Sequence, residues 1–202
     1  MKDAFAHLSQ ADPKMRKLIE QFGELTLPRE TVDFHSLATC ILGQQLSGTA
    51  ARSIYRKLAT GLDVDPENGR LDASAFESHS IESLRPYGLS RQKSTYILDL
   101  AERTRGNEIH FSKFEDMEDQ AIIDELVRVK GIGEWTVQML LMFSLARPDV
   151  LPVNDLGIQN GFRLLFKLDA KPKAKQMVEL AEKWRPYRSY ASLYLWKLKD
   201  EA

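Results

Sequence analysis

Two short stretches of the sequence contain residues whose types and spacing could do chemistry, and the first is a tight glycine turn. Gly131-Ile132-Gly133 lies between two segments with helical apolar spacing, so it must reverse the chain within very few residues. Glycine lacks Cβ, tolerates positive φ and lets a phosphate approach the backbone. The next helix begins with unpaired N–H groups and the positive end of its dipole. The pattern indicates either a phosphate-binding hairpin or a plain tight turn, and apolar residues at Val129, Ile132 and Val137 favour the hairpin.

The second stretch is Leu151-Pro152-Val153-Asn154-Asp155-Leu156-Gly157, about twenty residues beyond the turn. A fixed carboxylate such as Asp155 can stabilise developing positive charge, and it can orient or deprotonate an attacking water. The same aspartate stands where the N-cap of a helix over 156–166 is expected. The two interpretations are compatible, because a carboxylate held at the start of a helix is a rigidly placed anion. Asn154 is either a hydrogen-bonding loop residue or a helper of the aspartate.

Helices must position both stretches, because apolar residues recur at helical spacing along most of the chain. The sequence predicts helices at Pro13–Phe22, Thr31–Leu46, Ser47–Leu58, Ala75–Ser78, Ile81–Tyr87, Met117–Val129, Trp135–Leu145, Leu156–Phe166, Lys173–Trp184 and Tyr187–Leu198, with another that begins at the cap Ser90. Residues 60–74 are rich in Gly, Asp, Pro and Asn, which is typical of a loop. Alternating strand patterns are absent from the sequence. We therefore expect an all-α protein of about ten helices.

The composition is that of an ordinary globular protein. The chain has 202 residues, 28 Lys and Arg against 29 Asp and Glu, and 43% hydrophobic residues, which excludes collagen-like, coiled-coil and disordered chains. The single cysteine, Cys40, excludes an internal disulfide, a four-cysteine iron–sulfur cluster and a cysteine-rich zinc site. No apolar run approaches the ~20 residues that cross a membrane. The first residues lack the apolar core of a signal peptide, so we expect an intracellular protein.

Positive charge gathers in the last quarter of the chain. The formal net charge is −1, yet residues 160–202 contain ten Lys and Arg against five Asp and Glu. This region is either a surface that follows phosphates or an ordinary solvated surface.

Several stretches, in the same order, resemble the helix–hairpin–helix superfamily of DNA glycosylases. They are the glycine turn with its following aspartate, then Ile41-Leu42-Gly43-Gln44-Gln45-Leu46-Ser47 with Ala50-Ala51, and Trp184-Arg185-Pro186-Tyr187-Arg188-Ser189-Tyr190-Ala191 with Trp196. The last two are similar to the 3-methyladenine DNA glycosylase II branch in its compact all-helical form. The resemblance covers about residues 31–199. It implies about ten helices in two lobes, with residues 31–130 as the middle lobe, residues 1–30 and 131–202 as the second lobe, and an active-site cleft between them.

The resemblance implies a base excision repair enzyme that hydrolyses the N-glycosidic bond of alkylated purines, of the 3-methyladenine or 7-methylguanine type, flipped out of duplex DNA. In the family the aspartate that matches Asp155 is catalytic and faces the deoxyribose. Relatives that also cut the backbone carry a lysine at the position of Trp135, so the expected enzyme is monofunctional and leaves an abasic site. The alternatives are a glycosylase for deaminated or mismatched bases and a non-catalytic helix–hairpin–helix module that binds DNA.

Further site residues follow from the same resemblance. Gln45 matches the position whose side chain enters the vacated base stack, with Gln44 as a supporting contact; the alternative is that both only cap and pack the end of a helix. Trp135 and Trp196 match positions of the base pocket, where an indole suits a cationic base. Met139 either closes that pocket or packs in the core. The expected phosphate contacts are Gly131, Gly133, Thr136, Lys130, Arg91 and Lys93, of which the last two are equally explained as solvated surface residues.

The resemblance implies no required cofactor. The hairpin of the family often holds a Na⁺ or K⁺ ion through backbone carbonyls, which here are those of Val127, Val129 and Ile132. The expected partner is double-stranded DNA that contains a damaged base, with no membrane association and a monomeric chain. The expected location is the cytoplasm or nucleoid of a bacterial cell, or the nucleus of a eukaryotic one.

Overall fold

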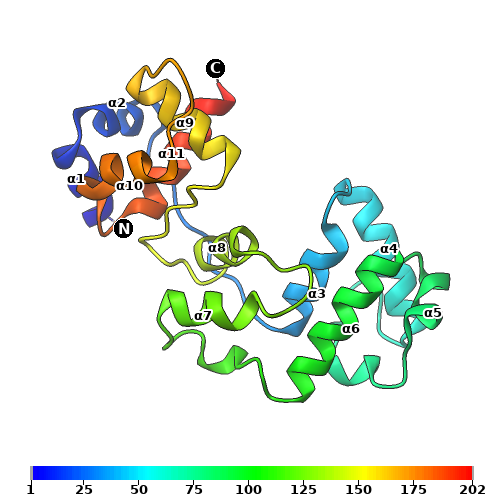
Figure 1. Cartoon of the computed structure of the whole chain (residues 1–202). Helices are drawn as coiled ribbons and strands as arrows, with labels where there is room; N and C mark the ends of the chain where they lie inside the picture. The colour runs from blue at the N-terminus through cyan, green and yellow to red at the C-terminus, as the bar shows by residue number, and fades with distance from the viewer. Residues whose placement is uncertain (1, 202) are drawn as a thin grey trace. The chain divides into compact units, whose positions relative to one another are not determined.

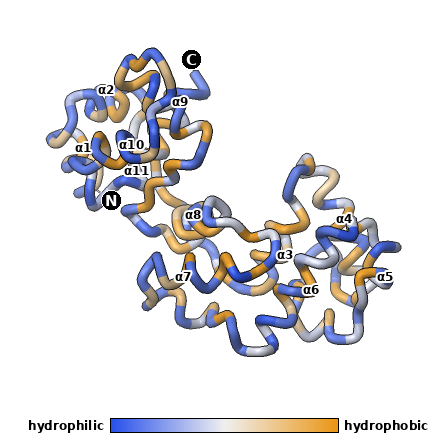
Figure 2. The backbone as a smooth tube through the Cα atoms, in the orientation of Figure 1, coloured by the Kyte–Doolittle hydropathy of each residue, from blue (hydrophilic) through white to orange (hydrophobic). Residues whose placement is uncertain are grey.

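The protein is described by a computed structural model that covers residues 2–201, and these residues form helices and connecting segments (Figure 1). Within this range there are eleven α-helices and four short 3-10 helices, and no strand is present. The predicted all-α fold is therefore confirmed. None of the helices in this range has both the length and the apolar character needed to cross a bilayer. Figure 2 shows that apolar residues recur at intervals within the helices, as an amphipathic pattern requires.

The described chain divides into two compact units. The first unit joins the residues up to Glu30 with those from Gln138 onward, and the second unit is Thr31–Val137. The second boundary between the two units, after Val137, falls inside helix α8 (Glu134–Phe143). The glycine turn thus belongs with the middle helices, whereas its two glycines were predicted to belong with the terminal segments.

The first unit is built on two helices that pack closely along their length, α9 (Leu156–Phe166) and α11 (Arg188–Asp200). Glycines on α9 allow this approach, because a Cβ on Gly161 would lie 2.6 Å from the carbonyl oxygen of Leu195. The remaining helices of the unit are α1 (Lys2–Ala11), α2 (Pro13–Phe22), α10 (Ala174–Ala181) and the 3-10 helix η4 (Glu182–Trp184). Helix α1 was not predicted, although Ala4, Phe5 and Leu8 form its buried face.

The second unit contains the predicted helices of the middle of the chain, with somewhat different bounds, and one 3-10 helix, η3, that was not predicted. They are α3 (Phe34–Gly43), α4 (Gly48–Gly61), η1 (Ala73–Phe76), α5 (Ile81–Leu84), η2 (Arg85–Tyr87), α6 (Arg91–Arg105), η3 (Phe111–Lys113) and α7 (Asp119–Leu126). Helix α6 begins at the predicted cap, since Ser90 Oγ accepts a hydrogen bond of 3.2 Å from the Lys93 N–H. The expected helix over 81–87 is instead α5 followed by η2, with Gly88 in the left-handed region at φ 93°.

A buried carboxylate ties the two ends of the first unit together. Asp12, the N-cap of α2, is 1% exposed and accepts hydrogen bonds from Lys14 N at 2.9 Å and from Trp184 Nε1 at 3.0 Å. Lys183 Nζ lies 2.9 Å from Asp12 Oδ2. Burial alone would raise the pKa of Asp12, but these donors together hold the pKa below its usual value. Trp184 is fully buried, so its contact with Asp12 lies in the core of the unit.

Replacement of this carboxylate is expected to destabilise the protein in a pH-dependent way. Asp12→Asn should lower the free energy of unfolding by about 1–3 kcal/mol at pH 7, because Lys183 loses its charged partner. The pKa of Asp12 is lower in the folded state than the unfolded value of ~3.9, so its stabilisation is complete above that pH and disappears as pH falls through the folded pKa. Urea unfolding followed by circular dichroism should show the difference shrinking below about pH 4. Asp116→Asn, an exposed position in the second unit, is the control; an equal loss at pH 7 would contradict the prediction.

Candidate active site and glycine hairpin

Asp155 is the N-cap of α9, as the sequence predicted. Its backbone is extended, at φ −74° and ψ 127°, and its Oδ1 accepts a hydrogen bond of 2.8 Å from Ile158 N. The loop before it closes on itself, since Asp155 N donates to the Pro152 carbonyl at 3.0 Å. The Gln159 side chain donates from the first turn of α9 to the Val153 carbonyl at 3.1 Å. The carboxylate is therefore held by both the loop and the helix that follows.

Trp196 provides a second hydrogen bond to the same carboxylate oxygen. The indole Nε1 on α11 donates to Asp155 Oδ1 at 2.8 Å. This contact needs a glycine at position 157, because a Cβ there would lie 2.7 Å from Trp196 Cδ1 and 3.0 Å from Asp155 Oδ1. Phe143 packs on the indole, with ring centroids 5.7 Å apart and planes inclined by 33°. From the sequence, Trp196 was predicted only as a wall of the base pocket.

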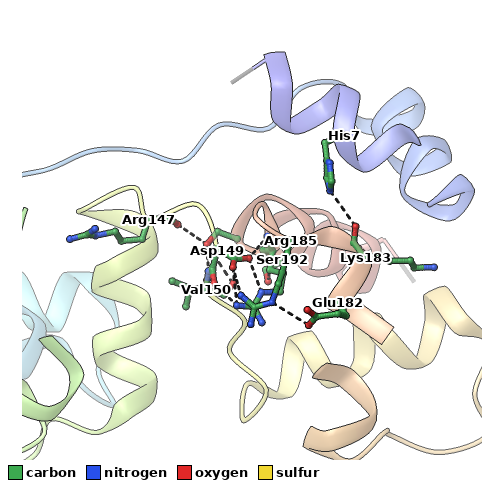
Figure 3. A network of polar contacts seen from close by, with 10 residues as sticks. His7, Arg147, Asp149, Val150, Glu182, Lys183, Arg185 and Ser192 are labelled. Atoms are coloured by element: carbon green, nitrogen blue, oxygen red, sulfur yellow. Dashed lines mark hydrogen bonds and ion pairs between the residues drawn. The ribbon is translucent and has the colours of Figure 1, made fainter. Parts of the chain in front are cut away.

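The segment that leads to Asp155 is clamped to the start of α11 (Figure 3). Asp149 accepts hydrogen bonds of 2.7 Å from Arg188 Nε and from Arg185 Nη1. The Ser189 hydroxyl donates to the Arg147 carbonyl at 2.7 Å and accepts from Val150 N at 2.8 Å. Residues at both ends of the 147–155 segment are thus fixed to α9 or α11, which gives the carboxylate a rigid support.

An open pocket of about 460 Å³ lies beside Trp196, lined by residues of α11 and of the segment after α2. Its lining residues are Glu24, Leu25, Thr26, Leu193, Trp196, Lys197 and Asp200. The Tyr194 hydroxyl donates to the Gly23 carbonyl at 2.8 Å and accepts from Leu25 N at 3.3 Å, which fixes the wall opposite α11. Neither this cavity nor Tyr194 was identified from the sequence.

The glycine hairpin is in the second unit, between α7 and α8, and its two glycines have different roles. Gly131 has φ 82°, and a Cβ there would lie 2.1 Å from Tyr96 Cδ2. Gly133 is outside the left-handed region, and a Cβ there would meet nothing within 4 Å. The turn itself therefore requires glycine only at position 131, under the Tyr96 ring. At Gly133 the backbone before α8 is exposed, with no side chain over it.

A buried aspartate on α6 supports the hairpin. Asp99 Oδ2 accepts hydrogen bonds from the Lys130 backbone N–H at 2.9 Å and from Arg103 Nε at 3.1 Å. The Lys130 ammonium lies 3.3 Å from Asp99 Oδ1. Burial would raise the pKa of Asp99, but the donors of Lys130 and Arg103 hold the pKa below its usual value. The predicted phosphate contact by Lys130 stays a prediction, and in the free protein this ammonium has a carboxylate partner.

The Gln-Gln pair follows the end of α3, and the Gln44 side chain forms a hydrogen bond with the hairpin. Gln44 Nε2 donates to the Gly131 carbonyl at 2.9 Å. Gln45 is exposed and has a left-handed backbone at φ 58°, which is uncommon for a residue other than glycine. Leu46, the next residue, exposes 40% of its surface. The turn thus presents Gln45 and an apolar neighbour to solvent, which suits the predicted wedge without testing it.

The other predicted contacts differ in their surroundings. Lys93 Nζ donates to the carbonyls of Leu42 at 2.5 Å and Gln44 at 2.8 Å, and its burial lowers its pKa. Lys93 thus caps the end of α3, a structural role that the sequence did not reveal. Arg91 is exposed in the first turn of α6, whereas Thr136 is half-buried in α8.

Trp135 stands in the first turn of α8 and exposes 48% of its surface. It belongs to the second unit with the hairpin, while Asp155 and Trp196 belong to the first. Met139, further along α8, is half-buried. About half of the Trp135 indole is therefore accessible from solvent at the start of α8.

The sequence matches the HhH-GPD superfamily, described as base excision DNA repair proteins, over residues 38–186. The match includes the Gln-Gln pair, the glycine hairpin and Asp155, and it extends over most of the chain. The chain belongs to the HhH-GPD superfamily. The family predicted from the motifs is therefore confirmed, and the match ends ten residues before Trp196.

Individual HhH-GPD relatives agree with this assignment. The chain is 32% identical to DNA-3-methyladenine glycosylase 1 of Schizosaccharomyces pombe, with 95% of this chain and 84% of the relative covered. It is 33% identical to the putative DNA-3-methyladenine glycosylase YfjP of Bacillus subtilis, where 81% of this chain spans 58% of the relative. Its fold is similar to that of the S. pombe 3-methyladenine DNA glycosylase Mag1 in complex with abasic DNA, with a TM-score of 0.77, 30% identity, and 96% and 95% of the two chains covered.

Proposed function

We propose that this protein is a monofunctional DNA glycosylase that hydrolyses the N-glycosidic bond of alkylated purines in duplex DNA. The observation that carries the proposal is the position of Asp155, whose Oδ1 is held by Ile158 N and Trp196 Nε1 at 2.8 Å each. The names of the relatives, 3-methyladenine glycosylases among them, support alkylated purines as the substrate class. Membership of a base excision repair superfamily supports DNA as the partner.

The proposed chemistry uses the charge of Asp155. When the bond between the base nitrogen and the sugar carbon breaks, the electron pair leaves with the base and positive charge develops on the sugar. The carboxylate stabilises that charge, and it accepts a proton from the water whose oxygen bonds to the sugar carbon. A base that carries a methyl group on N3 or N7 is already cationic, so it leaves as a neutral molecule without a strong general acid.

Trp135 supports both the substrate class and the absence of strand cleavage. An exposed indole attracts a cationic base through its π-face, which contributes ~0.5–2 kcal/mol. Indole nitrogen is not nucleophilic, so Trp135 cannot form the Schiff base on which strand cleavage by bifunctional relatives depends. The extruded base leaves a gap in the stack, for which the exposed Gln45 is the proposed wedge.

The hairpin is proposed to hold the DNA backbone without reading sequence. The exposed backbone at Gly133 lies next to the start of α8. There the backbone N–H groups and the positive end of the helix dipole would face a phosphate. Among the described residues, no backbone N–H outside the regular helices donates to the carbonyls of Val127 or Ile132. The Val129 carbonyl accepts a hydrogen bond of 3.1 Å from Ile132 N. These three oxygens are the proposed ligands of a Na⁺ or K⁺ ion, which would add positive charge beside the phosphate.

Asp155→Asn is expected to slow base release by at least about 100-fold while duplex binding stays close to wild type, because the amide keeps the shape but not the charge. The measurement is single-turnover release of 7-methylguanine from a duplex, with binding followed by fluorescence anisotropy. Asp169→Asn replaces an exposed carboxylate of the same unit and should keep the wild-type rate. Near wild-type excision by Asp155→Asn would rule out the proposed mechanism.

The enzyme is expected to leave strands intact and to form no covalent adduct. A duplex with one alkylated purine should show no break on a denaturing gel until alkali cleaves the abasic site. Borohydride added during the reaction should trap nothing. Lys130 is the nearest amine in the hairpin sequence, so a borohydride-stable adduct that disappears in Lys130→Ala would show that the lysine and the reaction are both misassigned.

The two hairpin glycines provide a matched pair of variants. Gly131→Ala should lower the stability by more than about 1 kcal/mol, because its φ is positive and its Cβ would overlap Tyr96. Gly133→Ala should leave stability unchanged or slightly raised, and Gly133→Leu should fold normally yet bind lesion and undamaged duplexes equally weakly. Weakening by Gly133→Leu for one lesion alone would contradict a sequence-independent phosphate contact.

A further inference from the structure

The N–H edge of the Trp196 indole is hydrogen-bonded to a carboxylate. Its Nε1 donates to Asp155 Oδ1 at 2.8 Å, and Phe143 packs on the ring. A side chain that served only as a wall for a base would need an aromatic face and no particular donor. The edge of the ring is oriented by a charge-assisted hydrogen bond, which is among the stronger polar contacts in proteins.

Neighbouring residues are arranged to keep that edge against the carboxylate. Gly157 leaves the space in which the indole reaches Oδ1, since a Cβ there would lie 2.7 Å from Trp196 Cδ1 and 2.9 Å from Nε1. Gly161, one turn later, allows the backbone of α11 to approach α9. Together the two glycines set the distance at which a donor from α11 meets the N-cap of α9.

The hydrogen bond from Ile158 N does not by itself fix the carboxylate. An N-cap side chain retains rotation about its χ angles within the limits of one hydrogen bond. A second donor, from a different helix and to the same oxygen, removes most of that freedom. The position of the anion then depends on the close packing of α9 against α11.

We propose that Trp196 is a positioning residue for Asp155 and that Gly157 is the position that permits its contact. This inference rests on the proposed function, because the carboxylate is useful to the reaction only where it meets the developing charge. Loss of the donor should therefore lower the rate of bond breaking for every base that the enzyme releases. Loss of an aromatic wall would instead affect cationic bases most.

Trp196→Phe separates the two roles, because it keeps an aromatic face and removes the N–H. It should slow single-turnover base release by about 10- to 100-fold, to a similar degree for cationic 7-methylguanine and for neutral hypoxanthine, with duplex binding within about twofold of wild type. Gly157→Ala should give the same pattern with both side chains retained. A loss confined to 7-methylguanine, or a wild-type rate for both variants, would overturn the proposal.

Trp184 offers a matched control, because its Nε1 donates to Asp12 at 3.0 Å in the same unit. Trp184→Phe should lower the melting temperature yet keep the wild-type rate below that temperature. A rate loss equal to that of Trp196→Phe would show that loss of any buried indole donor slows the enzyme, and it would overturn the positioning role.

A measurement without substrate keeps this inference separate from the proposed function. In ¹H–¹⁵N spectra, Asp155→Ala should shift the indole N–H signal of Trp196 and leave that of Trp184 in place, while Asp12→Asn should do the reverse. If the wild-type protein releases no 7-methylguanine, the proposed function fails. An unchanged Trp196 signal in Asp155→Ala would overturn the contact itself.

Discussion

One carboxylate oxygen that accepts two hydrogen bonds is the constraint on which the first unit depends. Asp155 Oδ1 receives the Ile158 N–H from its own helix and the Trp196 N–H from α11, each at 2.8 Å. Both bonds can form only if α9 and α11 lie close together, which the glycines at 157 and 161 permit. The clamp of Asp149 on Arg188 then fixes the other end of the loop. The packing of two helices thus determines where one negative charge stands.

The hairpin depends on the same kind of constraint, with a carboxylate on a helix holding a neighbouring turn. Asp99 on α6 accepts from the Lys130 backbone N–H, and Tyr96 on the same helix covers Gly131. Gln44 donates to the Gly131 carbonyl from the end of α3. Three side chains from two helices therefore define the turn, and Gly133 is left as the accessible part.

Local signals predicted the elements, whereas contacts between distant residues were not predictable. Ser90 and Asp155 were identified as caps, because a capping side chain bonds to a backbone group three residues away. The bond from Lys130 to Asp99 joins residues 31 apart, and that from Trp196 to Asp155 joins residues 41 apart. Sequence spacing cannot predict such pairs, because they form only when separate helices pack together. Helix α1 was missed for a related reason, because its short apolar face becomes evident only against its neighbours.

These contacts bear on the proposed role of the hairpin in binding DNA. The sequence suggested Lys130 and Lys93 as cations for phosphates, but in the free protein the first is paired with Asp99 and the second caps the carbonyls of α3. A phosphate at the proposed site would therefore be held mainly by backbone N–H groups at the start of α8, which carry no full charge. Each full cation that neutralises a phosphate makes the slope of log K against log salt concentration steeper by about 0.9. Binding through the hairpin should consequently depend less on salt than a count of its lysines implies.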